Sequence, residues 1–94
     1  GNDVKLGADV IILDSDKHSL DYNLRRDVST DSLNAKSDKI IIEDDVFVGT
    51  RSIITKGVVI GARSIIAAGS IVCKSIPSDE IWGGNPAKFI SKLN

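Results

Sequence analysis

The sequence from residue 42 to residue 77 repeats in steps of six: Ile42-Glu-Asp-Asp-Val-Phe47, Val48-Gly-Thr-Arg-Ser-Ile53, Ile54-Thr-Lys-Gly-Val-Val59, Ile60-Gly-Ala-Arg-Ser-Ile65, Ile66-Ala-Ala-Gly-Ser-Ile71 and Val72-Cys-Lys-Ser-Ile-Pro77. The first place of every step is Ile or Val, and the fifth is always small or β-branched. A period of six is neither helical nor strictly alternating. Hexapeptide repeats are typical of a parallel β-helix, in which three steps close one triangular coil. The pattern therefore predicts a mainly β prism whose first and fifth places face a narrow interior.

Three steps per coil place residues eighteen apart on neighbouring coils, at the strand spacing of about 4.8 Å. The predicted first-place ladders are Ile42 over Ile60, Val48 over Ile66 and Ile54 over Val72. The predicted fifth-place ladders are Val46 over Ser64, Ser52 over Ser70 and Val58 over Ile76. Glycines are expected at the corners, where a Cβ would hinder tight turning: Gly49 and Gly61 in second places, Gly57 and Gly69 in fourth places.

The segments around the repeats predict the remaining elements. The rhythm continues more weakly at the amino end, with Leu6, Val10 and Ile12 in inward places. Polar and charged residues dominate from about 19 to 39, which predicts an external loop. Pro77 is expected to end the register, because proline cannot donate a hydrogen bond into a ladder between coils.

The tail after Pro77 predicts one more partial coil around Ile81, a turn, and a short C-terminal helix at about 86–93. Asn85 would cap this helix, with Pro86 at its first position. Its expected buried face is Phe89, Ile90 and Leu93.

Composition limits the class of protein. The chain has 94 residues, which fits a single domain spanning 1–94. Twelve basic and thirteen acidic side chains give a net charge of −1, without the basic cluster typical of nucleic-acid binding. The single cysteine, Cys73, forms no internal disulfide and favours a cytoplasmic location. No apolar run reaches the roughly 18 residues of a membrane span, so none is expected.

Three features together resemble a known family. They are the repeat itself, the ending Ala67-Ala-Gly-Ser-Ile-Val-Cys-Lys-Ser-Ile-Pro77 with Gly84-Asn-Pro-Ala-Lys88, and Asp14-Ser-Asp-Lys-His18 before the polar excursion. The chain resembles the hexapeptide-repeat acyltransferases with a left-handed β-helix, in particular the sugar O-acetyltransferases related to the maltose and galactoside enzymes. The left hand comes from the resemblance alone, because crossovers in proteins are usually right-handed.

The resemblance implies transfer of an acetyl group from acetyl-CoA to a hydroxyl of a sugar or polysaccharide precursor, in a cleft between subunits of a homotrimer. It also implies a histidine general base, and His18 is the chain's only histidine. An alcohol is a poor nucleophile at neutral pH, so a base must remove its proton as it attacks the thioester. Asp14 and Asp16 are both candidates for orienting the imidazole.

For acetyl-CoA, the resemblance implies contacts at six positions: Phe47, Thr50, Ala68, Cys73, Lys74 and Lys88. Small residues leave room for the pantetheine arm, and the two lysines are expected to meet phosphates. Relatives often carry Trp where Phe47 stands and Thr where Cys73 stands. Trp82 is expected to cap the final coil, with packing beside the pantetheine as the alternative. Cys73 is expected to be chemically inert.

Other functions are weighed against this one. A carbonic anhydrase of the same architecture needs three histidine ligands for zinc, so one histidine per chain argues against it and no metal is predicted. A serine or other small-molecule acetyltransferase is a second possibility, although the long helical region that precedes the β-helix of serine acetyltransferases is not seen in this sequence. A non-catalytic or truncated β-helix used for oligomerisation or as a scaffold is the alternative from a different class.

Overall fold

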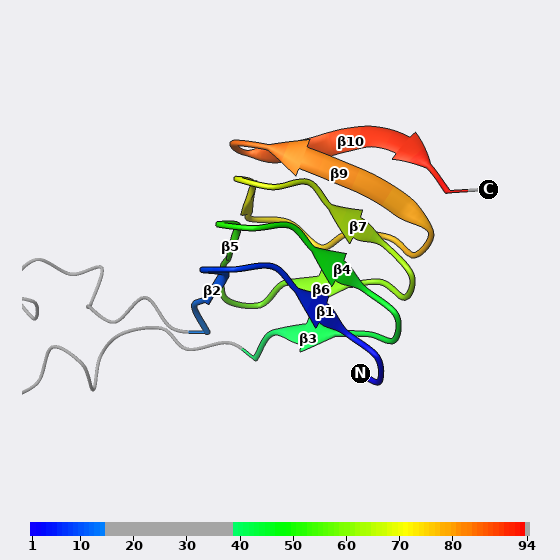
Figure 1. Ribbon diagram of the computed structural model, residues 1–94, viewed down its shortest axis with the longest axis horizontal. Coiled ribbons are helices and arrows are strands. Elements are labelled where there is room, and N and C mark those ends of the chain that lie inside the picture. The colour runs from blue at the N-terminus through cyan, green and yellow to red at the C-terminus, as the bar shows by residue number, and fades with distance from the viewer. Residues whose placement is uncertain (15–38, 94) are drawn as a thin grey trace, which may run out of the picture.

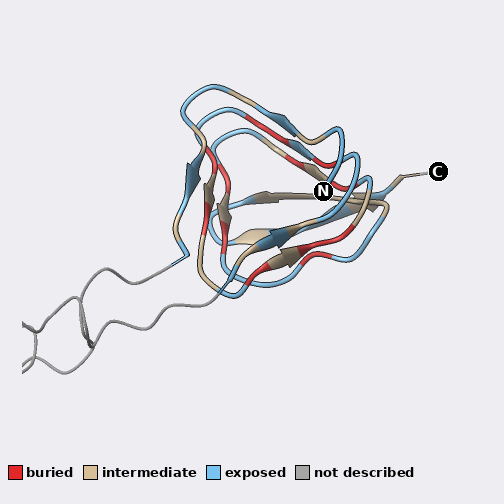
Figure 2. Cartoon of the chain, turned by 90° about the horizontal axis from the view of Figure 1, so that it is seen from below, coloured by how far each residue is buried: buried red, intermediate tan, exposed pale blue. Residues whose placement is uncertain are grey.

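The parallel β-helix predicted from the repeat is confirmed in a computed structural model, which describes residues 1–14 and 39–93. Short strands on successive coils stack into the three faces of a triangular prism (Figures 1 and 2). The strands are β1 Lys5–Leu6, β2 Ile11–Ile12, β3 Ile41–Ile42, β4 Phe47–Val48, β5 Ile53–Ile54, β6 Val59–Ile60, β7 Ile65–Ile66, β8 Ile71–Val72, β9 Glu80–Gly84 and β10 Ala87–Lys92.

Each face of the prism is a parallel ladder. The first face has the order β1-β4-β7-β9, the second β2-β5-β8 and the third β3-β6. The three predicted first-place ladders are confirmed: Ile42 pairs with Ile60, Val48 with Ile66 and Ile54 with Val72. The amino-terminal continuation is confirmed as well, because Leu6 pairs with Val48 and Ile12 with Ile54.

The interior holds the residues that the repeat places there. Eleven described residues have buried side chains, and all occupy first or fifth places: Val46, Val48, Ser52, Ile54, Val58, Ile60, Ser64, Ile66, Ser70, Val72 and Ile76. Figure 2 shows these buried stretches along the sides of the triangle. Leu6, on the first described strand of the first face, is 49% exposed. The core therefore runs along the axis of the prism.

The buried serines satisfy their hydroxyls without leaving the interior. Ser52 Oγ and Ser70 Oγ both donate to the carbonyl of Ala67, at 3.1 and 2.6 Å. Ser64 Oγ donates to the carbonyl of Pro77 at 2.5 Å. The predicted ladder of Ser52 and Ser70 is confirmed by the bond from Ser70 N to Ser52 Oγ. A small hydroxyl in the fifth place thus links coils where a larger side chain would not fit.

The fourth place of the first five steps turns the corner with a left-handed backbone. Gly57 and Gly69 have φ of 74° and 72°, as expected for corner glycines, and Asp45, Arg51 and Arg63 take the same conformation at 59°, 61° and 65°. Gly49, in a second place, has a different reason to be glycine. A Cβ there would lie 2.5 Å from the backbone nitrogen of Ala68 on the next coil. Close approach of the coils therefore excludes a side chain at Gly49.

This difference between the two kinds of glycine gives a testable pair. Gly49→Ala is expected to lower the free energy of unfolding by about 1–3 kcal/mol, because the neighbouring coil must shift. Gly69→Asn is the control, since nothing lies within 4 Å of a Cβ at Gly69 and asparagine tolerates the left-handed region. Its expected change is within about 1 kcal/mol. Urea unfolding of both variants measures the difference, and equal losses would contradict the assigned roles.

The last turn of the prism departs from the predicted register. Ile76 forms a bridge with Ile60, sixteen residues away, so the predicted ladder of Val58 over Ile76 is wrong. Ile81 likewise pairs with Ile65. Two residues are missing from the corner that follows β8, relative to the coils below. As a result of the shorter corner, Pro77 lies beside Gly61 on the coil below. The proline interrupts the pairing between coils only locally, because β9 pairs with β7 and continues the first face.

The predicted C-terminal helix at 86–93 is wrong. After Gly84, with φ of 106°, and a cis Asn85–Pro86 bond, the chain reverses and β10 pairs antiparallel with β9. A helix of about eight residues is barely stable by itself, whereas this strand satisfies the free edge of β9. Phe89 and Ile90 are 50% and 56% exposed rather than buried. Figure 1 shows the hairpin at the end of the stack.

Two other expectations concern the external loop and membrane-spanning helices. The loop at about 19–39 lies outside the described residues, apart from Lys39. In the described parts of the chain, no helix has the length and apolar character that a membrane crossing requires.

Candidate functional site

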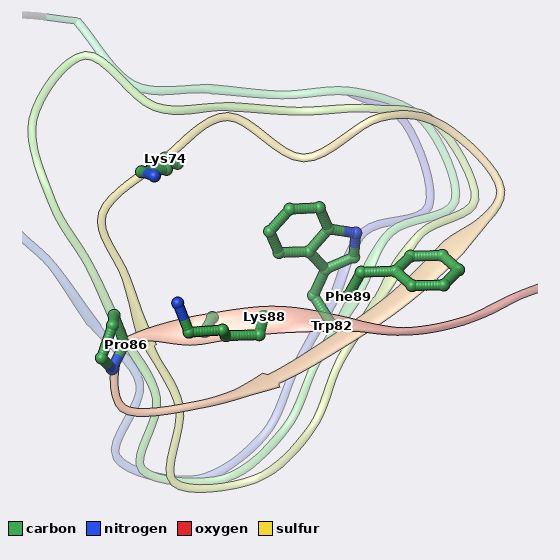
Figure 3. Close-up of a pocket in the computed structure, with 6 residues that line it drawn as sticks. Lys74, Trp82, Pro86, Lys88 and Phe89 are labelled. Carbon is green, nitrogen blue, oxygen red and sulfur yellow. The ribbon is translucent and has the colours of Figure 1, made fainter.

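A pocket lies at the C-terminal end of the prism, between the last coil and the hairpin (Figure 3). Its volume is about 200 Å³. Two of the predicted CoA-binding residues meet there, since Lys74 reaches it from the corner after β8 and Lys88 from β10. The complete lining is Lys74, Trp82, Pro86, Ala87, Lys88 and Phe89. The structure thus brings two cations and two aromatic rings to one pocket.

Trp82 closes the column of inward residues on the first face. It pairs with Ile66 in the ladder and packs against the buried core, so the predicted cap is confirmed. Figure 3 shows the indole spread across the end of the triangular coil, beside β10. Its Nε1 donates to Glu80 Oε1 at 2.8 Å, and its ring meets Phe89 edge to face, with centroids 6.4 Å apart. The indole is therefore held from two sides.

Phe47, Thr50 and Ala68 lie lower on the prism. Phe47 is on β4, on the outer side of the first face, and is 45% exposed. Thr50 and Ala68 follow the ends of β4 and β7, so they occupy equivalent positions at one edge of the prism. Both are exposed, and the Thr50 carbonyl accepts a hydrogen bond from Gly69 N at 2.8 Å. This edge presents small side chains to solvent.

Asp14 belongs to a different edge. The register of β2, β5 and β8 places Asp14, Lys56 and Lys74 at equivalent positions on three successive coils. Cys73 precedes Lys74 there and is an exposed free thiol. His18 and Asp16, the predicted base and one predicted partner, lie outside the described residues. Asp14 is the last described residue before the gap at 15–38, and it lies at the edge that also carries Lys74.

One exposed ion pair stabilises the last corner. Arg63 Nε and Nη2 bond the two carboxylate oxygens of Asp79 at 2.5 and 2.8 Å. The side-chain hydrogen bond to Asp79 raises the pKa of Arg63, and the same bond lowers the pKa of Asp79. Both side chains are about half exposed, so solvent screens the interaction.

The stabilisation from this pair is expected to depend on pH. Because the pKa of Asp79 in the folded chain is lowered, the contribution is present above the ordinary aspartate pKa of about 3.9 and is lost as the pH falls through the folded value. Asp79→Asn should therefore lower the melting temperature slightly at pH 7, and this difference should shrink as the pH falls from 7 into the acid range and the carboxylate of Asp79 is protonated. Thermal unfolding of both proteins across this range is the measurement, and a gap independent of pH would contradict the assignment.

Pro86, Ala87 and Phe89 were not foreseen as pocket residues, and Glu80 was not foreseen as the hydrogen-bond partner of the Trp82 indole nitrogen. Phe89 was assigned to the buried face of a helix, and Glu80 received no role. The Gly83-Gly84 pair between two short apolar runs is a hairpin signal that could have placed them. The partial coil predicted at Ile81 is confirmed as β9.

Known proteins match both the repeat and the chain as a whole. The family model for the hexapeptide repeat of succinyl-transferase matches residues 39–74. A hexapeptide-repeat acetyltransferase of Vibrio cholerae, solved with acetyl-CoA, superposes with a TM-score of 0.86 at 38% identity, over 100% of this chain and 48% of that one. A galactoside acetyltransferase solved with coenzyme A gives a TM-score of 0.88 at 32% identity, over 100% of this chain and 44% of that one.

A curated plant protein also matches part of the chain. Gamma carbonic anhydrase 2 of Arabidopsis thaliana is 52% identical over 54 residues, which are 55% of this chain and 19% of that protein. The chain thus spans about half the length of the solved acetyltransferases and about a fifth of the plant enzyme. The repeat match, together with superposition along the full length of the chain, shows that the chain has the hexapeptide-repeat left-handed β-helix fold of these proteins.

Proposed function

We propose that the chain is the β-helix part of a CoA-dependent O-acetyltransferase that moves an acetyl group from acetyl-CoA to a hydroxyl of a sugar or polysaccharide precursor. The observation that carries this proposal is the superposition of the whole chain, at 38% identity, on an acetyltransferase solved with acetyl-CoA. The galactoside acetyltransferase supports a saccharide as the class of acceptor.

The proposed chemistry is direct transfer in a ternary complex. His18 removes the proton of the acceptor hydroxyl, whose oxygen attacks the acetyl carbonyl and forms the new ester bond. The carbon–sulfur bond of the thioester then breaks, and the CoA sulfur leaves and takes up the proton from the imidazolium. Asp14 or Asp16 would hold the ring in the required tautomer.

The chain's exposed edges fit an extended acyl donor. Thr50 and Ala68 leave an edge without bulky side chains, where a pantetheine arm would have room, and Phe47 offers an exposed ring on the adjacent face. Lys74 and Lys88 supply cations at the end of the prism, where phosphates would be held. Cys73 lies beside Lys74 on the same exposed corner.

We further propose that the site is shared between copies in a homotrimer. Ala68 and Lys74 are six residues apart across one whole face of the prism, a span of up to about 20 Å. The edge that carries Asp14 and leads to His18 is therefore separated from the edge that carries Thr50 and Ala68. Packing of one edge against the other edge of a second copy would bring the two groups together.

The test of the activity is a thiol-release assay with acetyl-CoA and a panel of acceptors, run on the full chain. Galactosides, maltose and a polysaccharide fragment are expected to release thiol faster than buffer alone. Serine is included because a serine acetyltransferase is the second acyltransferase candidate. No release with any acceptor, while the chain is folded by circular dichroism, would contradict the proposal and favour a non-catalytic β-helix.

Mixing of two inactive variants tests the shared site. His18→Ala chains and Ala68→Trp chains are unfolded together, refolded as mixed trimers and assayed. If each site takes His18 from one copy and Ala68 from the next, about a quarter of the sites regain both groups when copies mix at random. Activity that stays at the level of the separate variants would place both residues of a site on one chain.

Carbonic anhydrase is the second candidate, because of the 52% identity to the plant enzyme over 54 residues. Catalytic zinc in such sites is held by three protein ligands, commonly histidines. This chain has one histidine, so three copies would have to contribute one each. A CO₂-hydration assay with added zinc distinguishes the two candidates, and zinc-dependent hydration that His18→Ala abolishes would favour the anhydrase.

A further inference from the structure

Two buried serine hydroxyls meet at one backbone carbonyl. Ser52, on the coil below, and Ser70, three residues further along the chain, both donate to the carbonyl oxygen of Ala67, at 3.1 and 2.6 Å. Both serines are fully buried. A carbonyl oxygen has two lone pairs, so it can accept both bonds. The carbonyl of Ala67 is therefore held toward the interior of the prism.

The direction of this carbonyl determines the direction of the next amide. A trans peptide is planar, and its C=O and N–H point to opposite sides. The peptide between Ala67 and Ala68 is trans, and its carbonyl points toward the buried Ser52 and Ser70. The N–H of Ala68, which is an exposed residue, therefore points away from the interior. The two hydroxyls thus present a backbone donor on the outer surface, at the edge where the pantetheine arm is proposed to lie.

Ser70 also joins this corner to the hairpin of β9 and β10, which lies on the last coil (Figure 1). Its Oγ accepts a hydrogen bond from the N–H of Gly84 at 3.1 Å. Gly83 permits this close approach, because a Cβ there would lie 2.7 Å from the Cβ of Ala67. The same hairpin carries Lys88. Ser70 therefore links the corner of Ala67 to the strand that holds one of the proposed phosphate contacts.

A third buried serine makes a similar bond at another edge. Ser64 also occupies a fifth place, is fully buried, and donates from Oγ to the carbonyl of Pro77 at 2.5 Å. None of the six positions proposed to contact acetyl-CoA lies at that edge, which carries Gly61 and Pro77 on successive coils. Ser64 thus has the same structural surroundings as the other two serines without their place beside the proposed donor.

We propose that Ser52 and Ser70 are positioning residues for the acyl donor. Their hydroxyls hold the Ala67–Ala68 peptide with its N–H outward, and Ser70 keeps this amide at a fixed place relative to Lys88. The inference rests on the proposed function, because it assigns the two serines to the binding of acetyl-CoA. Neither serine contacts the donor, since both are buried. A hydrogen-bond donor that is already oriented need not be ordered on binding, which favours affinity.

Alanine variants of the two serines test this role through the Kd of CoA, measured by calorimetry. Ser70→Ala is expected to raise the Kd about three- to tenfold, because it removes both the bond to Ala67 and the acceptor for the N–H of Gly84. Ser52→Ala should raise the Kd about two- to threefold, since Ser70 still holds the carbonyl. In the thiol-release assay, the KM for acetyl-CoA should rise while kcat stays within about twofold.

Ser64→Ala is the matched control. It also removes a buried hydrogen bond and is expected to lower the urea midpoint, but the Kd of CoA should stay within about twofold. Ser70→Thr keeps the hydroxyl and should restore the Kd to within about twofold of the unmodified chain. A β-branched side chain fits other fifth places, which hold Val46 and Val58. Circular dichroism checks that each variant is folded.

Amide hydrogen exchange gives a readout that does not depend on CoA. The amide of Gly84 is expected to exchange about three- to tenfold faster in Ser70→Ala than in the unmodified chain, because its acceptor is lost. In Ser64→Ala its rate should be unchanged. An unchanged rate in Ser70→Ala would contradict the link between the corner and the hairpin.

Two further results would overturn the proposal. Equal increases in Kd for Ser70→Ala and Ser64→Ala would reduce both to a general loss of stability. A Kd for Ser70→Thr as high as for Ser70→Ala, in a folded chain, would show that the hydroxyl is not the group on which binding depends.

Failure of this inference is distinguishable from failure of the proposed function. An unmodified chain that neither binds CoA nor releases thiol would contradict the proposed function, and the role of the serines with it. CoA binding by the unmodified chain that Ser52→Ala and Ser70→Ala leave unchanged would contradict the positioning role alone.

Discussion

Replacing His18 with alanine is expected to lower kcat for acetyl transfer by about 10²- to 10⁴-fold, the usual contribution of a general base. The acceptor hydroxyl would keep its proton as it attacks, and no other histidine in the chain could replace the base. The KM for acetyl-CoA should change little, because the proposed donor contacts lie on other residues. Steady-state thiol release with saturating acceptor is the measurement.

Lys17→Ala is the matched control, since it alters the neighbouring residue and removes no group that can act as a base near neutral pH. Its kcat should stay within about twofold of the unmodified chain. The pH profile adds a second readout, because activity that depends on a neutral imidazole should fall as the pH is lowered and the ring becomes protonated. Retention of most activity by His18→Ala, with the usual acid limb still present, would assign the base elsewhere.

Ile66→Ala is expected to lower the free energy of unfolding by about 2–5 kcal/mol. Ile66 is fully buried between Val48 on the coil below and Trp82 at the end of the prism. Truncation leaves a cavity that the narrow interior cannot close without moving a backbone ladder. Urea unfolding followed by circular dichroism gives the value.

Ile65→Ala is the control for this prediction because Ile65 precedes Ile66 on the same strand but faces outward and is only half-buried. Its expected loss is below about 1.5 kcal/mol. Equal losses for the two variants would mean that the outer face is covered as completely as the interior, as it would be if a second copy packs on β7. Measurement at several protein concentrations separates these cases, because only an interface makes the stability depend on concentration.

The coils were predictable because their pattern is local and repeated. A first-place Ile or Val and a small or β-branched fifth-place residue recur in six successive steps, and each coil supplies the template for the next. The ladder of Ile54 and Val72 therefore followed from counting residues. The ladder of Val58 and Ile76 failed because the count assumes a constant coil length, and the corner after β8 is two residues shorter.

The tail was less predictable because its conformation depends on what surrounds it. Asn85-Pro86 followed by apolar residues fits the start of a helix. The sequence pattern does not reveal that β9 has an edge available for pairing. The strand β10 forms instead of the predicted helix because it gains hydrogen bonds to β9 along its length. Phe89 consequently moves from a predicted helix face to the edge of Trp82.

The candidate site was also only partly predictable from the sequence. Lys74 and Lys88 were identified by resemblance to a family motif, and the resemblance alone suggested His18 as a base. Their relation in space could not be read from spacing, because Lys88 reaches the pocket only after the chain reverses at Gly84. Glu80 had no sequence signal as the partner of the indole nitrogen, since its hydrogen bond to Trp82 arises from their geometry on one strand.

The sequence by itself thus determined the prism: which side chains face inward, where the corners lie, and which family the chain resembles. It could do so because burial along a solenoid depends on neighbours at a fixed spacing. Only the tertiary structure decided how the prism ends. The hairpin, the partly buried indole of Trp82 and the meeting of Lys74 with Lys88 depend on the strand edge of β9, which β10 pairs, and on the end of the core, which Trp82 covers. Both requirements come from the assembled coils rather than from any local pattern.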